Sequence, residues 1–138
     1  EYIDGREFNL SILPGGDVLP PAEMLFIDYP PTRTRVVGYE AKWEEDSFAY
    51  QHTERTFSFP EEDAPLLKEL TALAKETYAL FGASGYARVD FRVNKAGEPF
   101  ILELNSNPCI APDSGFVAAA AEAGYSYERL IETLITEV

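Results

Sequence analysis

The sequence has 138 residues, of which 46% are hydrophobic and 13% aromatic, so it predicts one folded domain and excludes a disordered chain. Its formal net charge of −13 excludes a nucleic-acid-binding surface, because phosphate backbones require clustered lysine and arginine. No apolar run reaches the roughly 20 residues that cross a bilayer, and the first residues show no signal-peptide pattern, so no membrane partner is expected.

Two strands are predicted first along the chain. Residues 8–13 alternate between polar and apolar side chains, and the Pro-Gly-Gly-Asp cluster at 14–17 predicts a turn into a second strand at 18–26. Residues 30–60 show little periodicity. An irregular stretch of this length is unusual in a compact domain, so we expect it to be functional or mobile.

The clearest helical pattern follows between residues 61 and 82, where apolar side chains recur on one broad face. The remaining elements are predicted as strands at 86–93 and 99–105, then helices at 116–123 and from Ser126 to near Val138. The predicted fold class is therefore α+β, an antiparallel β-sheet with helices packed on one face.

Cysteine and histidine each occur once, as Cys109 and His52. A single cysteine cannot form an internal disulfide, and these two side chains cannot assemble an ordinary zinc site. We therefore expect the protein to be cytoplasmic. We also expect Cys109 to be buried and to behave as a small apolar residue. The chain begins at Glu1, without methionine and within an apolar stretch, which indicates a fragment of a longer protein.

Polar side chains gather on the two predicted strands at 86–93 and 99–105. Because side chains alternate along a strand, Arg88, Asp90 and Arg92 share one face of the first. The second is expected to carry Phe100, Leu102 and Leu104 on one face and Ile101, Glu103 and Asn105 on the other.

The register of these strands follows from the loop between them. Four loop residues after Asn94 would pair that residue with Pro99, which places Asp90 directly opposite Glu103. Opposed carboxylates repel one another unless one is protonated, a cation lies between them, or both point into water. With the amide oxygen of Asn105 they offer hard oxygen ligands that suit Mg²⁺ or Mn²⁺; a solvated sheet face is the alternative.

Motifs along the whole chain resemble those of one family. The segments GYARVDF (85–91) and FILELNSNP (100–108) look like the C-terminal signature of the D-alanine–D-alanine ligases, which are ATP-grasp enzymes. EYIDGREF (1–8) resembles the family's hinge, YEAKW (39–43) its mobile loop, and AGYSY (123–127) its ending. These matches agree in order and spacing.

This resemblance implies that residues 1–138 are the C-terminal catalytic subdomain of a longer ATP-grasp ligase. The implied reaction is ATP-dependent amide formation between a carboxylate and an amine, through an acyl phosphate. The remaining ATP-grasp half and an N-terminal domain of the same chain are the expected partners, and a homodimer is left open. The alternatives are a ligase with a non-amino-acid acceptor and a nucleotide-binding regulatory module without turnover.

The resemblance also implies how the nucleotide is held. The backbone of Tyr2 and Ile3 would bind the adenine edge. Glu7 would bind the ribose hydroxyls, and Leu102 would pack against the adenine ring.

The resemblance also implies which residues bind the phosphates of ATP and the metal ions. Lys42 would reach the terminal phosphates of ATP, with Trp43 in place of the family's usual aromatic residue. Asp90 would hold one of two magnesium ions, Glu103 would bridge both, and Asn105 would hold the second.

The acceptor end of the implied site departs from the family. Arg88 would stabilise the charge of the reaction intermediates, and Ser114 with the amide of Gly115 would bind the acceptor's carboxylate. After its proline, however, this sequence has Cys109 and Ala111 where the family usually has glycine and threonine. Cys109 is therefore expected to line an altered substrate pocket, and D-alanine is not assured as the acceptor.

Overall fold

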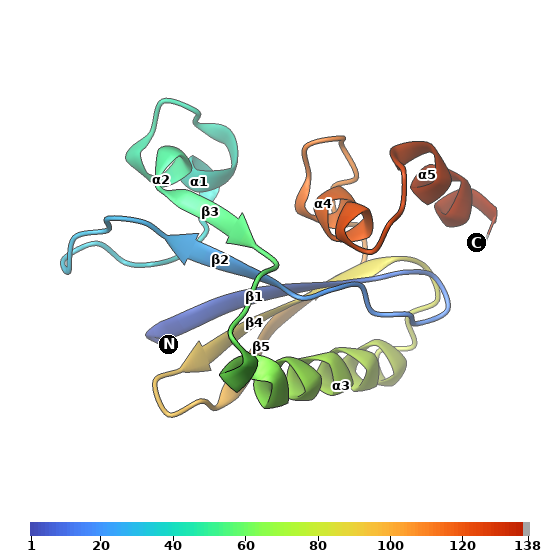
Figure 1. The fold of residues 1–138 in the computed structure, drawn as a ribbon, viewed down its shortest axis with the longest axis horizontal. Helices are drawn as coiled ribbons and strands as arrows, with labels where there is room; N and C mark the ends of the chain where they lie inside the picture. Colours follow the sequence, from blue (N-terminus) through green and yellow to red (C-terminus); the bar gives the residue numbers. More distant parts are fainter. Residues whose placement is uncertain (137–138) are drawn as a thin grey trace.

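Residues 1–136 are described by a computed structural model, in which five strands form one antiparallel sheet with the order β3-β2-β1-β4-β5 (Figure 1). The strands are β1 (Gly5–Ile12), β2 (Ala22–Phe26), β3 (Thr53–Thr56), β4 (Ala87–Asn94) and β5 (Pro99–Asn105). The predicted α+β class with an antiparallel sheet is confirmed. The first strand begins three residues earlier than predicted, and the second begins four residues later.

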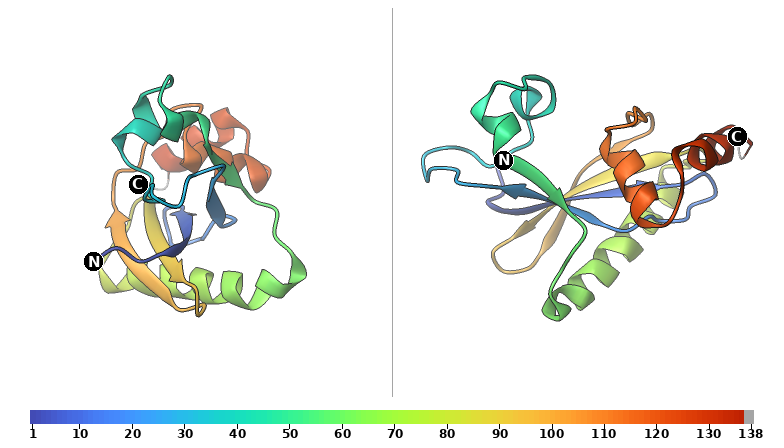
Figure 2. Two further views of the ribbon diagram at one scale, coloured as in Figure 1. Left: turned by 90° about the vertical axis from the view of Figure 1, so that its left-hand side faces the viewer. Right: turned by 45° about the horizontal axis from the view of Figure 1, so that its top comes forward.

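The helices lie on both sides of this sheet, so the predicted packing of helices on one face alone is wrong. They are α1 (Tyr39–Trp43), α2 (Phe48–Gln51), the 3-10 turn η1 (Glu61–Asp63), α3 (Ala64–Leu80), α4 (Gly115–Glu122) and α5 (Tyr127–Thr136). In Figures 1 and 2, α3 runs along one side, whereas α1 and α2 at one end and α4 and α5 at the other rise on the opposite side. No helix within residues 1–136 is long and apolar enough to span a membrane. The predicted end of the last helix near Val138 lies outside the described residues.

The main core fills the space between α3 and the sheet. Alternate positions of the two central strands face the helix, because side chains alternate across a strand. The buried set is Phe8, Leu10 and Ile12 of β1, Ala87, Val89, Phe91 and Val93 of β4, and Leu70, Ala74 and Tyr78 of α3. Burying each large apolar side chain stabilises the fold by roughly 1.5–3 kcal/mol. The intervening positions of β1 and β4 are thereby directed to the other face of the sheet.

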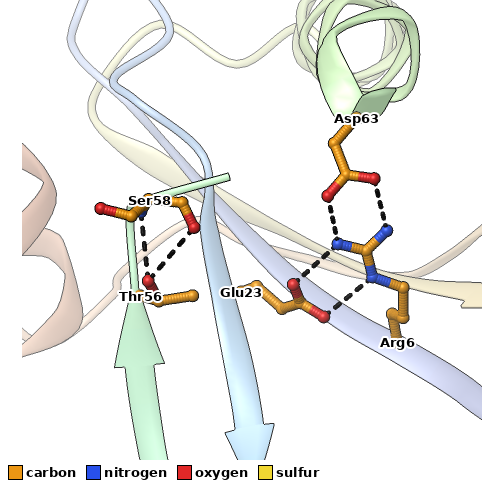
Figure 3. Close-up of polar contacts among 5 residues, drawn as sticks. All are labelled: Arg6, Glu23, Thr56, Ser58 and Asp63. Atoms are coloured by element: carbon orange, nitrogen blue, oxygen red, sulfur yellow. Dashed lines mark hydrogen bonds and ion pairs between the residues drawn. The ribbon is translucent and has the colours of Figure 1, made fainter. Parts of the chain in front are cut away.

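One arginine fastens the start of α3 to the neighbouring strands β1 and β2 (Figure 3). Arg6 of β1 donates two hydrogen bonds to Glu23 of β2, at 2.9 and 2.8 Å, and two to Asp63, at 3.0 and 2.8 Å. The hydrogen bonds to Glu23 and then Asp63 raise the pKa of Arg6, and the bond from Arg6 lowers the pKa of Asp63. Nearby, Thr56 Oγ1 accepts a 3.1 Å hydrogen bond from the backbone N–H of Ser58, at the end of β3.

A second apolar cluster supports α4 and α5. Phe116 and Ala120 of α4 and Leu130 of α5 pack with Leu13 and Leu19 from the segment between β1 and β2. This cluster is separate from the one under α3, so the start of α4 is held in place by its own core.

Candidate functional site

The loop that joins β4 to β5 is shorter than the sequence predicts. The backbone N–H of Asn94 donates to the carbonyl of Glu98 at 3.0 Å, and Val93, not Asn94, pairs with Pro99. Three residues therefore form the loop, and Gly97 has the positive φ of +84° that this type of hairpin requires at its last position. The predicted pairing of Asn94 with Pro99 is wrong by one residue.

A β-bulge then corrects the register further along the hairpin. The pairing shifts between Asp90 and Phe91, which leaves Leu102 as an extra residue in β5. Asp90 consequently lies opposite Glu103, as predicted, and two residues further Arg88 lies opposite Asn105.

The bulge also changes which face two side chains occupy. Phe100 is the partner of Arg92 and Ile101 is the partner of Phe91. Because opposed residues share a face, the predicted faces of Phe100 and Ile101 are exchanged. The polar face thus has an aromatic side chain at its edge, next to the candidate metal ligands.

Asp90 is the centre of the polar face. The residue is only 7% exposed, and its carboxylate accepts hydrogen bonds from Arg88 Nε at 2.8 Å, from Arg88 Nη2 at 2.9 Å, and from Asn9 Nδ2 at 2.8 Å. Burial by itself would lower the pKa of Arg88, but the hydrogen bonds and charge of Asp90, with the charge of Glu103, raise it. Both oxygens of this buried carboxylate therefore have charged or polar hydrogen-bond partners.

Glu103 differs from Asp90, although the two lie opposite one another. It is exposed, and within residues 1–136 it forms no ion pair. The amide oxygen of Asn105 accepts a 2.9 Å hydrogen bond from the backbone N–H of Asn107. Asp90 and Asn105 are thus held in place by hydrogen bonds, while Glu103 remains open to solvent.

This donor set fits a magnesium ion that takes further ligands from elsewhere. Magnesium commonly binds one or two carboxylates and completes its shell with water and substrate phosphates. Asp90, Glu103 and Asn105 match that pattern in number and in atom type. In the described part of the chain there is no cluster of three or more His, Cys, Asp or Glu side chains, so a closed protein cage is not formed there.

The first residues of the chain are fixed by an arginine that the sequence alone does not single out. Arg92 of β4 donates from Nε to the carbonyl of Ile3 and from Nη2 to the hydroxyl of Tyr2, both at 3.0 Å. Its third nitrogen, Nη1, lies 3.9 Å from Glu7 Oε2. Burial raises the pKa of Glu7, the charge of Asp90 also raises it, and the charges of Arg92 and Lys42 oppose this.

The mobile-loop candidates occupy α1, within the stretch that the sequence predicts to be irregular. The positive charge of Lys42 acts to lower the pKa of Glu7, and the side chain of Trp43 belongs to a residue that is 62% exposed. The same stretch meets the start of the chain, where the backbone N–H of Arg35 donates to the Tyr2 hydroxyl at 3.4 Å. This loop therefore lies next to Tyr2 and Glu7.

The acceptor-end candidates meet at the start of α4. Ser114 is the N-cap of this helix, and its Oγ accepts a 3.4 Å hydrogen bond from the backbone N–H of Val117. Gly115 comes next, and a Cβ placed on it would lie 3.1 Å from Nη2 of Arg55. Cys109 is exposed, which corrects the expectation that it is buried.

Sequence reasoning missed Arg55. It belongs to β3, on the face that its partner Met24 shares with Glu7. Burial and the charge of Arg88 lower the pKa of Arg55, while Asp113 opposes them. The four-residue strand that carries Arg55 is too short to show a clear alternation, so the sequence holds little signal for it.

Comparison with known proteins matches the whole described chain to one family. The model of the D-ala D-ala ligase C-terminus matches residues 1–136. A D-alanine–D-alanine ligase of Pseudoalteromonas translucida is 33% identical over 138 residues, which covers 99% of this chain and 40% of that protein. An uncharacterized protein of Sinorhizobium fredii, y4sG, is 34% identical over 139 residues, covering 98% of this chain and 38% of that protein.

The fold agrees with solved structures. The D-alanine–D-alanine ligase of Bacillus anthracis, crystallised with ATP, superimposes with a TM-score of 0.72 at 23% identity, covering 99% of this chain and 38% of that one. The chain thus spans about two fifths of the length of the relatives it matches, at 38% and 40% for the two sequences above.

Proposed function

The chain belongs to the family of D-alanine–D-alanine ligase C-terminal domains, and from this premise we propose that it is the C-terminal ATP-grasp part of an ATP-dependent carboxylate–amine ligase. The observation that carries the proposal is the opposed pair of Asp90 and Glu103, flanked on the same sheet face by Arg88 and Asn105. Such a pair is destabilising in an ordinary sheet and useful where divalent cations must meet a triphosphate.

The proposed reaction moves the γ-phosphoryl group of ATP onto a substrate carboxylate. The resulting acyl phosphate is attacked by an amine, an amide forms, and inorganic phosphate leaves. Asp90 and Asn105 would each hold one magnesium ion and Glu103 would bridge the two; when bound, these ions offset the repulsion between the reacting anions.

Arg88 is proposed to stabilise the negative charge on the acyl phosphate and on the tetrahedral intermediate. Its Nε and Nη2 atoms are already used by Asp90. Nη1 and the second hydrogen of Nη2 remain available, because a guanidinium carries five N–H donors. The ion pair to Asp90 fixes the orientation of this group in advance, which favours stabilisation of a developing charge.

The nucleotide is proposed to lie along the start of β1 and the bulge of β5. The backbone of Tyr2 and Ile3 would meet the adenine edge, and Glu7 the ribose. Leu102, which is 49% exposed at the bulge, would cover the adenine ring, since an exposed leucine beside a polar face offers apolar contact area. Lys42 would reach the terminal phosphates and Trp43 would shield them.

A second version of the proposal keeps this chemistry and changes the acceptor. Ser114, the amide of Gly115 and the neighbouring Cys109 would form its pocket. The presence of Arg55 against Gly115 favours an acceptor that carries negative charge at this end. With Cys109 and Ala111 in place of glycine and threonine, this acceptor is proposed to differ from D-alanine.

The test is phosphate release from ATP by the full-length protein, with a panel of D- and L-amino acids and other amines. We expect stimulation by one carboxylate–amine pair. Glu103→Gln should lower kcat by about a hundredfold or more, because the bridging ligand loses its charge. Glu98→Gln, in the hairpin loop of the same strand pair, is the matched control.

Each result has a defined meaning. Unchanged turnover in Glu103→Gln would remove the metal assignment. ATP binding without stimulation by any pair would favour a regulatory module that lacks turnover.

A further inference from the structure

Two buried polar atoms on the sheet face have no hydrogen-bond partner. Within the described residues, these are Oε2 of Glu7 and Nη1 of Arg92. Glu7 is 8% exposed and Arg92 is 2% exposed. Leaving such groups unsatisfied is costly, and native structures retain few of them. A pair that faces each other therefore points to a missing third group.

Arg92 has little freedom to relieve this by moving. Its Nε is used by the carbonyl of Ile3 and its Nη2 by the hydroxyl of Tyr2, and its guanidinium lies 5.1 Å from the centre of the Tyr2 ring. On another side the ring of Phe26 lies at 5.9 Å. Nη1 is thus the one nitrogen of this guanidinium without a partner, and the other contacts aim it at Glu7.

The spacing of the two atoms selects the chemistry of the third group. At 3.9 Å, Nη1 and Oε2 are too far apart for a direct hydrogen bond. One oxygen about 2.8 Å from each would satisfy both atoms. That oxygen must accept from Arg92 and donate to Glu7. A hydroxyl does both, whereas a carboxylate or phosphate oxygen cannot donate and an ammonium cannot accept.

We propose that Arg92 and Glu7 jointly recognise a ribose hydroxyl of ATP, with Arg92 donating to the hydroxyl oxygen and Glu7 accepting its proton. This rests on the proposed function, which places the ribose at Glu7. Arg92 is then a nucleotide-binding residue in its own right, and it also positions the Tyr2–Ile3 backbone that is proposed to meet the adenine. Both hydrogen bonds of the hydroxyl involve a charged partner and are correspondingly strong.

The experiment compares two nucleotides on the full-length protein. Dissociation constants for ATP and for 2′,3′-dideoxy-ATP are measured by calorimetry with magnesium present. The wild-type protein should prefer ATP by about a hundredfold, because each of the two hydrogen bonds to a charged group is worth about tenfold or more. In Arg92→Met the ratio should fall by about tenfold, because only the hydrogen bond to Glu7 remains.

A matched control is available in α5. Arg129 also lies over a tyrosine ring, at 4.6 Å from the centre of Tyr125, but belongs to another part of the fold. Arg129→Met should keep the wild-type ratio. Should Arg92→Met fail to fold in a thermal scan, Arg92→Lys keeps the buried charge. It should still lower the ratio, because one ammonium cannot lie near Ile3, Tyr2 and the ribose together.

The outcomes separate this inference from the proposed function. Failure of the wild-type protein to bind ATP would overturn the proposed function. Tight ATP binding with equal affinity for the dideoxy nucleotide would overturn the inference alone. A water molecule would then be the group that bridges Glu7 Oε2 and Arg92 Nη1. An Arg92 variant that retains the wild-type ratio would overturn it as well.

Discussion

Gly5 and Gly115 both lie close to other atoms, but Gly5 faces backbone and Gly115 faces a side chain. A Cβ on Gly5 would lie 1.9 Å from the carbonyl oxygen of Val93 and 2.9 Å from its carbonyl carbon, both backbone atoms of β4. We expect Gly5→Ala to destabilise the protein by about 3 kcal/mol, since β1 and β4 would have to separate. A fall in the midpoint of thermal unfolding of the full-length protein measures this.

Gly115 provides the comparison. Its nearest neighbour would be the flexible end of Arg55, at 3.1 Å, which can move aside. Gly115→Ala should therefore cost less than about 1 kcal/mol. Gly85→Ala, with nothing within 4 Å, should be close to neutral. Equal losses in Gly5→Ala and Gly115→Ala would contradict this reading of the two contacts.

Single residues differ in how far the sequence alone reveals them. Alternation along one strand is enough to place Arg88, Asp90 and Arg92 on a common face, because that is a local property. Arg55 and Arg92 owe their interest to contacts with Gly115, Tyr2 and other residues that are distant along the chain. Such contacts leave no pattern in the local sequence.

Among the elements, α3 depends on Arg6 for its attachment at one end. Arg6→Met keeps much of the aliphatic stem but removes four hydrogen bonds to Glu23 and Asp63. We expect a loss of about 2 kcal/mol at neutral pH. Because the folded pKa of Asp63 lies below its ordinary value of 3.8, the stabilisation is present above that value and is lost as pH falls through the folded pKa.

Thermal unfolding of wild type and Arg6→Met at several pH values tests this. The gap between them should narrow as the pH drops below about 4. Arg33→Met removes an exposed ion pair to Glu40 and should cost less than about 0.5 kcal/mol at any of these pH values. A gap that does not change with pH would show that Arg6 acts through packing alone.

The hairpin of β4 and β5 shows where element-level prediction succeeds and where it fails. The opposition of Asp90 to Glu103 was predicted from a four-residue loop, but it arises from a three-residue loop and a bulge at Leu102 that offset one another. A bulge has no strong sequence signature. Likewise α1, α2 and β3 have only four or five residues each, too few for their periodicity to show within residues 30–60.

For the molecule as a whole, the described sheet is proposed to form one wall of a nucleotide site, on a chain of net charge −13. ATP is itself strongly anionic, so its binding requires cations beyond those of this chain. We expect the 138-residue chain alone to show no ATP turnover, while the full-length protein turns over with its proper substrates. Phosphate release measures both, and turnover by the isolated chain at a comparable rate would contradict the proposed division of the site.

The two-sided sheet has a consequence for how this protein can diversify. On β1 and β4, residues that pack against α3 alternate with residues on the opposite face of the sheet, where the nucleotide is proposed to bind. Single substitutions on that face can therefore change which ligand the protein binds without disturbing the apolar side chains that neighbour them along each strand.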